Sequence, residues 1–291
     1  MSIQSTIEAS SASLSPSARR VADAIRANPS IVINHNINEL AQASNTSVAT
    51  VVRFCRTIGL TGYAQLRMQL ATELGKEAAQ FGPSMAFGAD IGRDDALPEV
   101  MAKISSLEKL AIDETIAGLD PEQVERVARL LDGAPKILLF GIGASLFVAE
   151  DLQHKLLRIG RNAFCSRDPH EAWAAASLAT PDTVVIGFSF QGETQETLRF
   201  IELAVEHGAT AVAITSSGSS SLAKTSNEVL LAAARETTLR AGAMVSRIAQ
   251  LCVVDVLFLA VARLRYDDTV RALWLTRQAT RELKAPRITD S

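Results

Sequence analysis

Two polar segments in the second half of the chain follow apolar runs and combine glycines with hydroxyl side chains. GIGAS (141–145) follows KILLF, and SFQGET (189–194) follows VVIGF. Glycines at such points let backbone N–H groups approach a ligand, and a helix that begins there adds the positive end of its dipole. If the two turns lie at adjacent strand ends, they converge on one anion. The sequence therefore predicts a site for an anionic small molecule.

The residues expected to bind this anion are Ser145, Ser189, Gln191 and Thr194 through their side chains, and Gly143 and Gly192 through the backbone. Arg247 pairs either with the anion or with a helix acid, and His170 either caps a helix or lines the pocket. Taken alone, GIGAS is equally compatible with a plain strand-to-helix turn. The G-x-G-x-x-G dinucleotide pattern is absent, because Leu146 occupies its third glycine position.

The sequence indicates no cofactor and no metal site. The three cysteines, Cys55, Cys165 and Cys252, are odd in number and far apart, and they have no metal-ligand spacing. This usage suits a reducing compartment, and we expect all three to be core or half-core residues.

A second group of functional candidates lies near the start of the chain, where residues 44–67 contain three arginines and no acid. Ser47 can cap a helix, and Asn45 precedes it where a tight turn needs left-handed backbone. Within this helix, a buried stripe is predicted at i, i+3, i+4 and i+7, made of Val51, Phe54, Cys55 and Ile58. Ala49, Thr50, Arg53 and Arg56 are then expected to face outward.

A turn of three or four residues before a helix with Ser, Thr and Arg is typical of a DNA-binding helix-turn-helix. The side chains expected to meet base edges in the major groove are Ser47, Ala49, Thr50 and Arg53, with Arg56 and Tyr63 on phosphates. A bundle surface usually mixes acids and bases, so the purely basic face favours DNA. For the individual arginines, the alternative is an ordinary solvated helix face.

These two sites belong to different parts of the expected fold. Residues 1–78 predict an all-α helix-turn-helix domain, residues 79–96 a linker, and residues 97–291 an α/β domain. In the last part, five short apolar runs alternate with helical segments, which predicts a doubly wound five-stranded parallel sheet covered on both faces. Ligands of such sheets bind beyond the carboxyl ends of the strands, where the polar segments fall.

Composition and charge limit the class of protein. The 291 residues are 47% hydrophobic and 21% charged, with a net charge of −3, as in an ordinary globular protein. Residues 1–80 carry seven Lys and Arg against five Asp and Glu, a mild excess that favours an anionic partner. No membrane-length apolar run or signal peptide is evident, so a soluble cytoplasmic protein is expected.

The segments VVRFCRTIGLTGYAQLR, GIGAS, DLQHKLLRIG and VVIGFSFQGETQET resemble the RpiR-type bacterial transcription regulators, and the resemblance extends from Leu14 to Leu283. These regulators join a helix-turn-helix to a sugar isomerase (SIS) domain. The resemblance implies that the SIS domain binds a phosphorylated sugar that alters operator binding. It also implies that Ser145, Ser189 and Thr194 are phosphate ligands. Gln191 departs from the pattern, since SIS domains more often have Ser or Thr there.

The identity of the sugar is less defined. AGAMVSRIAQLCVVDVLF and KLLRIGRNAFCSRDPHEA are most similar to regulators of N-acetylmuramic acid 6-phosphate or related amino-sugar catabolism. The main alternative effector is a keto-deoxy acid phosphate. We expect a homodimer, formed through the SIS helices and residues 97–117, on a palindromic double-stranded operator. The sequence does not specify whether dimers pair into tetramers, or whether the protein represses or activates transcription. It also does not specify whether the effector releases the protein from DNA or recruits it.

Two other classes of function compete with this interpretation. A phosphosugar isomerase with an accessory helical domain needs a base, for which Glu150, Asp151, His154 and the His170-Glu171 pair are the candidates. Surface, packing or capping roles are the more common ones for such residues. The third class is a scaffold that binds protein partners through the sheet domain. A DNA-reading domain joined to a phosphosugar pocket is explained by sensing, so we expect no enzymatic activity.

Overall fold

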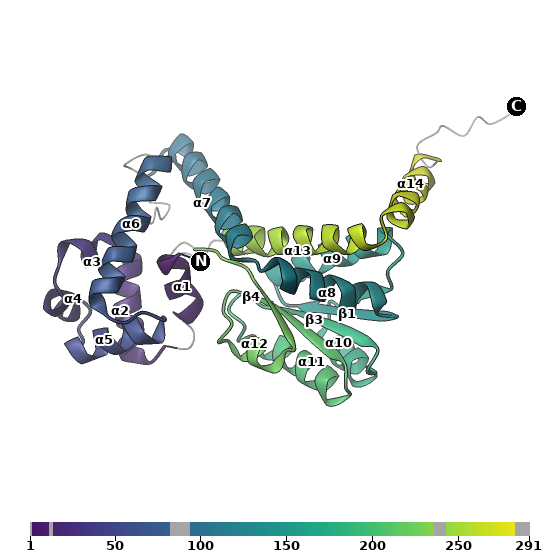
Figure 1. Cartoon of the computed structure of the whole chain (residues 1–291), viewed down its shortest axis with the longest axis horizontal. Coiled ribbons are helices and arrows are strands. Elements are labelled where there is room, and N and C mark those ends of the chain that lie inside the picture. Colours follow the sequence, from purple (N-terminus) through teal and green to yellow (C-terminus); the bar gives the residue numbers. More distant parts are fainter. Residues whose placement is uncertain (1, 12–13, 82–93, 236–242, 283–291) are drawn as a thin grey trace, which may run out of the picture.

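The computed structural model describes residues 2–11, 14–81, 94–235 and 243–282. A helical N-terminal part and a C-terminal α/β part are joined through the long helices α6 and α7 (Figure 1). Their hydrophobic cores are separate: one is built from residues between Ile7 and Leu70, the others from residues between Ala111 and Val261. The predicted mixed architecture is confirmed.

The N-terminal helices in the described residues are α1 (Ile3–Ser10), α2 (Pro16–Ala27), α3 (Ser30–Asn34), α4 (Ile37–Ala43), α5 (Val48–Thr57) and α6 (Tyr63–Phe81). Local signals set their ends. The Ser15 hydroxyl accepts from the backbone of Ala18 at the start of α2, with Pro16 in the first turn. Asn36 and Glu39 form a capping box at the start of α4.

Two features of the N-terminal part differ from the sequence prediction. Helix α1 is not predicted, because its stretch reads as a Ser-rich lead; Ile7 is nevertheless fully buried in the core. Helix α6 continues to Phe81, so the predicted boundary at residue 78 lies within a helix. Most of the predicted linker, residues 82–93, lies outside the described residues.

The α/β part contains α7 (Leu97–Gly118), α8 (Pro121–Gly133), β1 (Lys136–Gly141), α9 (Ala144–Arg158), β2 (Ala163–Cys165), α10 (Pro169–Ser177), β3 (Thr183–Phe188), α11 (Gln195–Glu206), β4 (Thr210–Thr215), α12 (Ser221–Thr225), β5 (Glu228–Leu231), α13 (Met244–Leu264) and α14 (Tyr266–Glu282). The sheet is parallel throughout, in the order β2-β1-β3-β4-β5. The predicted five-stranded parallel sheet is therefore confirmed. Helices α12 and α14 are not predicted.

Helices cover both faces of the sheet. One core joins α8, α9 and α13 to alternate residues of β1 and β3, such as Leu139 and Ile186. The other joins α10, α11 and α12 to the intervening residues, such as Leu138 and Val185. Each strand is thus apolar at successive positions, which is typical of a parallel sheet buried on both sides. This sandwich fixes the strand ends, where the predicted ligands lie.

Helix α13 is long and apolar enough to cross a membrane, by length and composition alone. It instead packs against α7, α8 and α9, and its residues Val253, Leu257 and Val261 are buried in the core of the α/β part. Among the described helices no other passes the same test. The composition of α13 is therefore explained by its place in the core.

Candidate functional site

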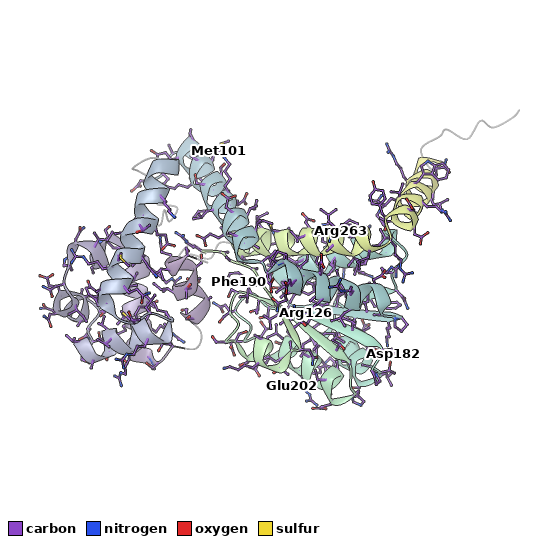
Figure 2. The ribbon with its side chains drawn as sticks, viewed as in Figure 1. Met101, Arg126, Asp182, Phe190, Glu202 and Arg263 are labelled. Atoms are coloured by element: carbon purple, nitrogen blue, oxygen red, sulfur yellow. The ribbon has the colours of Figure 1, made fainter. Side chains whose placement is uncertain are left out.

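The two predicted anion-binding segments leave neighbouring strands at the same edge of the sheet. Strands β1 and β3 are paired, with Gly141 opposite Phe188. A Cβ atom on Gly141 would lie 3.0 Å from both the Phe188 side chain and the Ser145 backbone, so the two loops nearly touch. Asp182 and Phe190 lie at opposite ends of β3, and the Phe190 end faces the N-terminal helices (Figure 2). The expected convergence of the two turns is present.

Residues 189–194 form a compact loop closed by its own polar groups. The Ser189 and Thr194 hydroxyls are 2.9 Å apart, and the Gly192 amide donates to the Ser189 Oγ at 3.1 Å. Gly192 has a φ of 73°, and a Cβ there would lie 2.3 Å from the Ser220 Oγ. Ser189 and Gly192 are buried, whereas Gln191 and Thr194 are half-exposed. The loop therefore offers Gln191 and Thr194 to solvent and keeps Ser189 behind them.

The neighbouring strand and helix hold this loop in place through contacts that sequence reasoning missed. The Phe190 carbonyl accepts from the Ser216 amide at 2.7 Å and from the Thr215 hydroxyl at 3.0 Å. The Glu193 carboxylate accepts from the Ser221 amide at 2.9 Å and from its hydroxyl at 2.7 Å. Only the Ser-rich run 216–221 signals these partners in the sequence, and nothing local shows that they meet residues 190–193.

The GIGAS turn has the expected backbone but an unexpected partner. Gly143 has a φ of 61° and precedes α9. The Ser145 hydroxyl donates to the Gln250 Oε1 at 3.2 Å, and Gln250 on α13 is only 1% exposed. Gln250 occupies a position in the apolar stripe of α13, and this is the sequence signal that could have singled it out. Arg247, half-exposed, lies one turn earlier at the same end of α13.

His170 lies after β2, at the beginning of α10. Its backbone amide donates to the Asp168 carboxylate at 2.9 Å, and its exposed ring packs edge-on against Trp173 at 5.6 Å. The capping role belongs to Asp168, and His170 presents its ring to solvent. No hydrogen bond described for this part of the chain joins His170 or Arg247 to Ser145 or Ser189.

The predicted DNA-binding surface is centred on α5. Asn45 has the expected left-handed backbone, with a φ of 48°, and the Ser47 hydroxyl caps α5 through the amide of Thr50 at 3.2 Å. The buried stripe is confirmed, because Val51, Phe54, Cys55 and Ile58 are each at most 5% exposed. Ser47, Ala49, Arg53 and Arg56 are exposed, as predicted.

The prediction that Thr50 faces outward is wrong. Thr50 is 5% exposed, and its hydroxyl lies 3.0 Å from the Ser47 Oγ. Thr50 stands four residues before Phe54, so it shares the buried face of the helix. Arg53 donates to the Thr50 hydroxyl at 3.4 Å, which orients the arginine instead.

Tyr63 also has an internal partner. Its hydroxyl donates to the carbonyls of His35, at 2.8 Å, and Val32, at 3.1 Å, and ties α6 to α3. The donor is therefore committed within the domain, which weakens the case for a phosphate contact. Arg20, which sequence reasoning passed over, is exposed on α2 and donates to the Asn45 carbonyl at 3.1 Å. It adds positive charge beside the turn before α5.

A polar pocket of about 390 Å³ contains several residues considered for isomerase chemistry, including Glu150, His154 and Glu171. Glu150 is ion-paired with Arg167 at 2.5 Å. Cys165 lines the same pocket, and burial, together with the charge of Glu150, raises the pKa of its thiol to about 12.

The remaining isomerase candidate, Asp151, lies outside this pocket and is paired with Lys155 on the surface of α9. In the described residues, no group of His, Cys, Asp and Glu suits a metal ion.

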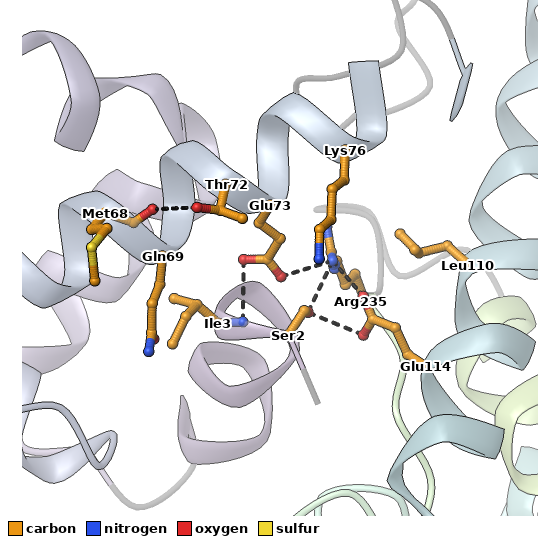
Figure 3. A pocket seen from close by; sticks show the side chains of 10 residues that line it. All are labelled: Ser2, Ile3, Met68, Gln69, Thr72, Glu73, Lys76, Leu110, Glu114 and Arg235. Carbon is orange, nitrogen blue, oxygen red and sulfur yellow. Dashed lines mark hydrogen bonds and ion pairs between the residues drawn. The ribbon is translucent and has the colours of Figure 1, made fainter. Parts of the chain in front are cut away.

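The junction between the two parts is held by a largely buried ionic cluster around Arg235 (Figure 3). Its guanidinium donates to Glu73 of α6 at 3.2 Å, to Ser2 at 2.9 Å and to Glu114 of α7. The side chains of Arg235, Glu73 and Glu114 are 15%, 13% and 11% exposed. We call Ser2, Glu73, Glu114 and Arg235 the junction cluster; they border a cavity of about 520 Å³.

Arg235 follows β5 in the chain, so the junction cluster is connected directly to the sheet. Between β5 and Arg235, the Ala233 amide and carbonyl both bond to the Thr115 hydroxyl of α7, at 3.0 and 3.2 Å. The carboxyl end of β5 lies on the same edge of the parallel sheet as the ends of β1 and β3. The candidate anion site and the junction therefore share one edge.

Comparison with known proteins agrees with this division. Residues 1–77 match the helix-turn-helix domain of the rpiR family, and residues 130–260 match the SIS domain. An uncharacterized HTH-type transcriptional regulator of Caldanaerobacter subterraneus is 39% identical over 93% of this chain and 94% of its own. The uncharacterized HTH-type regulator YbbH of Bacillus subtilis is 34% identical over 93% and 94%. The chain belongs to the RpiR family of transcriptional regulators.

Solved structures extend the comparison. The Vibrio vulnificus NanR protein complexed with ManNAc-6P is 28% identical and covers 97% of this chain and 98% of its own, with a TM-score of 0.61. The sugar isomerase domain of an RpiR transcription factor from Sphaerobacter thermophilus, 22% identical, covers 63% of this chain and 99% of its own with a TM-score of 0.57. The second likeness concerns the fold alone.

Proposed function

We propose that this RpiR-family protein is a sequence-specific DNA-binding regulator of sugar catabolism whose SIS domain binds a phosphorylated amino sugar. The observation that carries the proposal is the shared edge of the sheet. The paired ends of β1 and β3 bring two anion-binding turns together, and the end of β5, one strand further along the same edge than β4, leads into the junction cluster that contacts α6. One chain thus combines a ligand site, a reading helix and a physical link between them.

The effector site consists of the GIGAS turn and the loop 189–194. Ser145, Gln191 and Thr194 donate to the phosphate from side chains, while the amide at Gly143 and the start of α9 add backbone dipoles. The Gly192 amide, which the sequence predicts as a ligand, instead donates within the loop to Ser189. Ser189 fixes the loop by bonding Thr194 and Gly192. Arg247 and His170 reach the sugar from the ends of α13 and α10. NanR, complexed with ManNAc-6P, supports an amino-sugar phosphate as the ligand class.

The DNA-binding surface consists of Ser47, Ala49, Arg53 and Arg56 on α5, with Arg20 beside it. Arg53 donates to base edges and Arg56 to phosphates, because side chains early in a recognition helix enter the major groove. A homodimer presents two such helices about 34 Å apart on a palindromic site in the cytoplasm. Exposed apolar residues on α7, including Leu97 (71% exposed) and Met101 (64% exposed; Figure 2), support an interface there.

Coupling between the two sites follows from linkage. An effector that binds one arrangement of the junction better than another changes operator affinity by the ratio of its two affinities, typically about 1 to 3 kcal/mol. The junction cluster is the element that both sites can bias, because it joins the tail of β5 to α6 and α7. No turnover of the sugar is required for this response.

Isomerase activity is the alternative function, and the pocket with Glu150, His154 and Glu171 is what favours it. In the described contacts, however, Glu150 is engaged by Arg167, and none of these groups bonds to the loop 189–194. Relatives of the chain are named transcriptional regulators. Sugar-phosphate interconversion is therefore expected to be absent, and NMR of each sugar phosphate incubated with the protein tests this.

The test of the proposal is thermal stability in the presence of N-acetylmannosamine 6-phosphate, N-acetylmuramic acid 6-phosphate, N-acetylglucosamine 6-phosphate, glucosamine 6-phosphate and keto-deoxy-phosphogluconate. At 100 times its dissociation constant, the effector stabilises the fold by about 2.7 kcal/mol. The same compound should change affinity for an operator selected from random DNA. The proposal fails if no member of the panel shifts the melting temperature, or if the one that does leaves operator affinity unchanged.

A further inference from the structure

Gln250 is an anomaly in the core of the SIS domain. It lies on α13 in line with Val253 and Leu257, which are 1% and 0% exposed, and it is itself 1% exposed. An apolar side chain would fill such a position without hydrogen-bonding requirements, whereas a buried amide must satisfy both of its polar ends. A glutamine at this place therefore needs a reason beyond packing.

The amide of Gln250 is only half satisfied in this arrangement. Its Oε1 accepts from the Ser145 hydroxyl at 3.2 Å, while its Nε2 has no acceptor among the described residues. Ser145 has a single proton, and this bond directs it into the core. The Ser145 hydroxyl, which is proposed to bind the phosphate, therefore points its proton at Gln250 instead. In the same arrangement, the Gln250 Nε2 has no acceptor among the described residues.

Rotation of the amide by half a turn exchanges its oxygen and nitrogen at almost no change in shape. In the rotated arrangement, Nε2 donates to the Ser145 Oγ, and the Ser145 proton is released toward the turn before α9. The N–H dipole of Gln250 then also points toward the turn and favours negative charge there. One of the two N–H groups of Nε2 is then paired, whereas neither is paired in the first arrangement, and the carbonyl becomes unpaired instead. Unpaired acceptors are tolerated better than unpaired donors.

We infer that Gln250 is a positioning residue for the effector phosphate: an anion bound at the GIGAS turn selects the rotated amide, so that Gln250 donates to Ser145 and Ser145 donates to a phosphoryl oxygen. This inference rests on the proposed phosphosugar site. It assigns to α13 a part in discriminating phosphorylated from neutral sugars. Gln250 does so without touching the ligand, because the Ser145 hydroxyl lies between them.

The test combines three substitutions, Ser145→Ala, Gln250→Met and Gln250→Glu, with the double variant Ser145→Ala/Gln250→Met. Methionine keeps the length of the side chain and removes both polar ends. Glutamate keeps the shape, and in its ionised form it can only accept from Ser145 and its charge opposes the phosphate. Burial favours the protonated carboxyl, which can donate as the amide does, so this variant is measured at a pH high enough to ionise it. Val253→Ala, on the same face of α13, is the control for loosened packing. Dissociation constants are measured by calorimetry for whichever sugar phosphate of the panel stabilises the wild-type protein most, and for the same sugar without phosphate.

Gln250→Met is expected to weaken sugar-phosphate binding by about tenfold, because the Ser145 hydroxyl loses the donor that orients it toward the phosphate, and Gln250→Glu by more. The double variant should bind no more weakly than Ser145→Ala alone, because both residues act through one hydroxyl. Val253→Ala should bind like the wild type. The Gln250 side-chain amide signal, assigned by its loss in Gln250→Met, should shift on adding the sugar phosphate.

Additive losses in the double variant would overturn the inference, as would an unchanged affinity in Gln250→Glu or an amide signal that does not move. If Gln250→Met does not fold, the comparison of Gln250→Glu with the wild type still decides, and the amide signal is assigned by its loss in Gln250→Glu instead. These outcomes leave the proposed function standing when the wild-type protein binds the sugar phosphate. Failure of the wild type to bind any panel member overturns the proposed function and this inference together.

Discussion

The surface of α5 and the edge of the SIS sheet are both proposed to bind phosphate-bearing partners, but they are built in opposite ways. On α5 the exposed side chains Arg53 and Arg56 project from a helix whose other face is buried. At the sheet edge, the backbone and half-buried hydroxyls carry the site, and contacts from β4, α12 and α13 shape it. Binding by the exposed arginines of α5 should therefore survive small changes in the surrounding fold. Binding by the backbone and hydroxyls of the sheet edge should be lost when their surroundings move.

The largest effect should come from Gly192→Ala. Its Cβ would lie 2.3 Å from the Ser220 Oγ at a φ of 73°, so both the backbone and its neighbour must move. We expect a loss of about 3 kcal/mol in the free energy of unfolding and of sugar-phosphate binding. Denaturant titration and calorimetry measure the two. Gly59→Ala is the matched control, with a φ of 82° and open space around its Cβ, and should cost only about 1 kcal/mol. Equal costs for the two glycines would contradict the comparison.

Glu114→Gln tests the junction cluster between the two regions. It removes one of the carboxylates that contact the largely buried Arg235 in the described residues, but keeps the shape. We expect a loss of about 2 to 3 kcal/mol in stability and a weaker effect of the sugar phosphate on operator affinity. Operator titrations with and without the sugar phosphate measure the coupling. Glu125→Gln, which breaks the exposed pair with Arg263, should cost less than about 1 kcal/mol and leave the coupling intact. Unchanged coupling in Glu114→Gln would exclude the cluster from signalling.

Arg53→Ala should lower operator affinity by about 1 to 3 kcal/mol while leaving sugar-phosphate binding intact. Arg53 is exposed on α5, and the buried face of α5 belongs to a core separate from those of the sheet domain. Fluorescence anisotropy with the selected operator measures the first, and calorimetry the second. Arg53→Lys keeps the charge but not the bidentate geometry, and should retain binding to unrelated DNA better than binding to the operator. A parallel loss of sugar-phosphate binding would argue against two independent sites.

Thr50→Val should have the smallest effect on DNA. Its hydroxyl is buried and contacts only neighbours on the same helix, Ser47 and Arg53, in the described hydrogen bonds. The substitution should cost about 1 kcal/mol of stability and change operator affinity by less than about threefold. Thr50→Ser, which keeps the hydroxyl, is the control. A loss of operator affinity as large as that of Arg53→Ala, in a folded variant, would mean that Thr50 reads bases after all.

The sequence predicts features that depend on local spacing better than features that depend on contacts between distant segments. Asn45, Ser47 and the stripe from Val51 to Ile58 obey rules of local spacing, and the structure has them as expected. Thr50 was misplaced although its spacing of four from Phe54 places it on the buried face. Pairing of β1 with β3 does not follow from the order of elements alone, because doubly wound sheets occur with the strand orders 2-1-3-4-5 and 3-2-1-4-5-6, and β1 lies beside β4 in the second.

The missed contacts share one property, which is separation along the chain. Ser145 and Gln250 are 105 residues apart, and Glu193 and Ser221 are 28 apart. The junction cluster joins Ser2 to Arg235 across 233 residues. Periodicity in one segment carries no information about which distant segment packs against it. Only an irregularity, such as a glutamine in an apolar stripe, marks where such a partner is needed.

The separate hydrophobic cores of the two parts have an evolutionary consequence. Because no core cluster of the described residues includes side chains from both parts, the head formed by α1–α6 can be exchanged without repacking the sheet domain. The polar contacts that a transplanted N-terminal part must supply include the hydroxyls of Ser2 and Ser5, which donate to Glu114, and the carboxylate of Glu73, which accepts from Arg235.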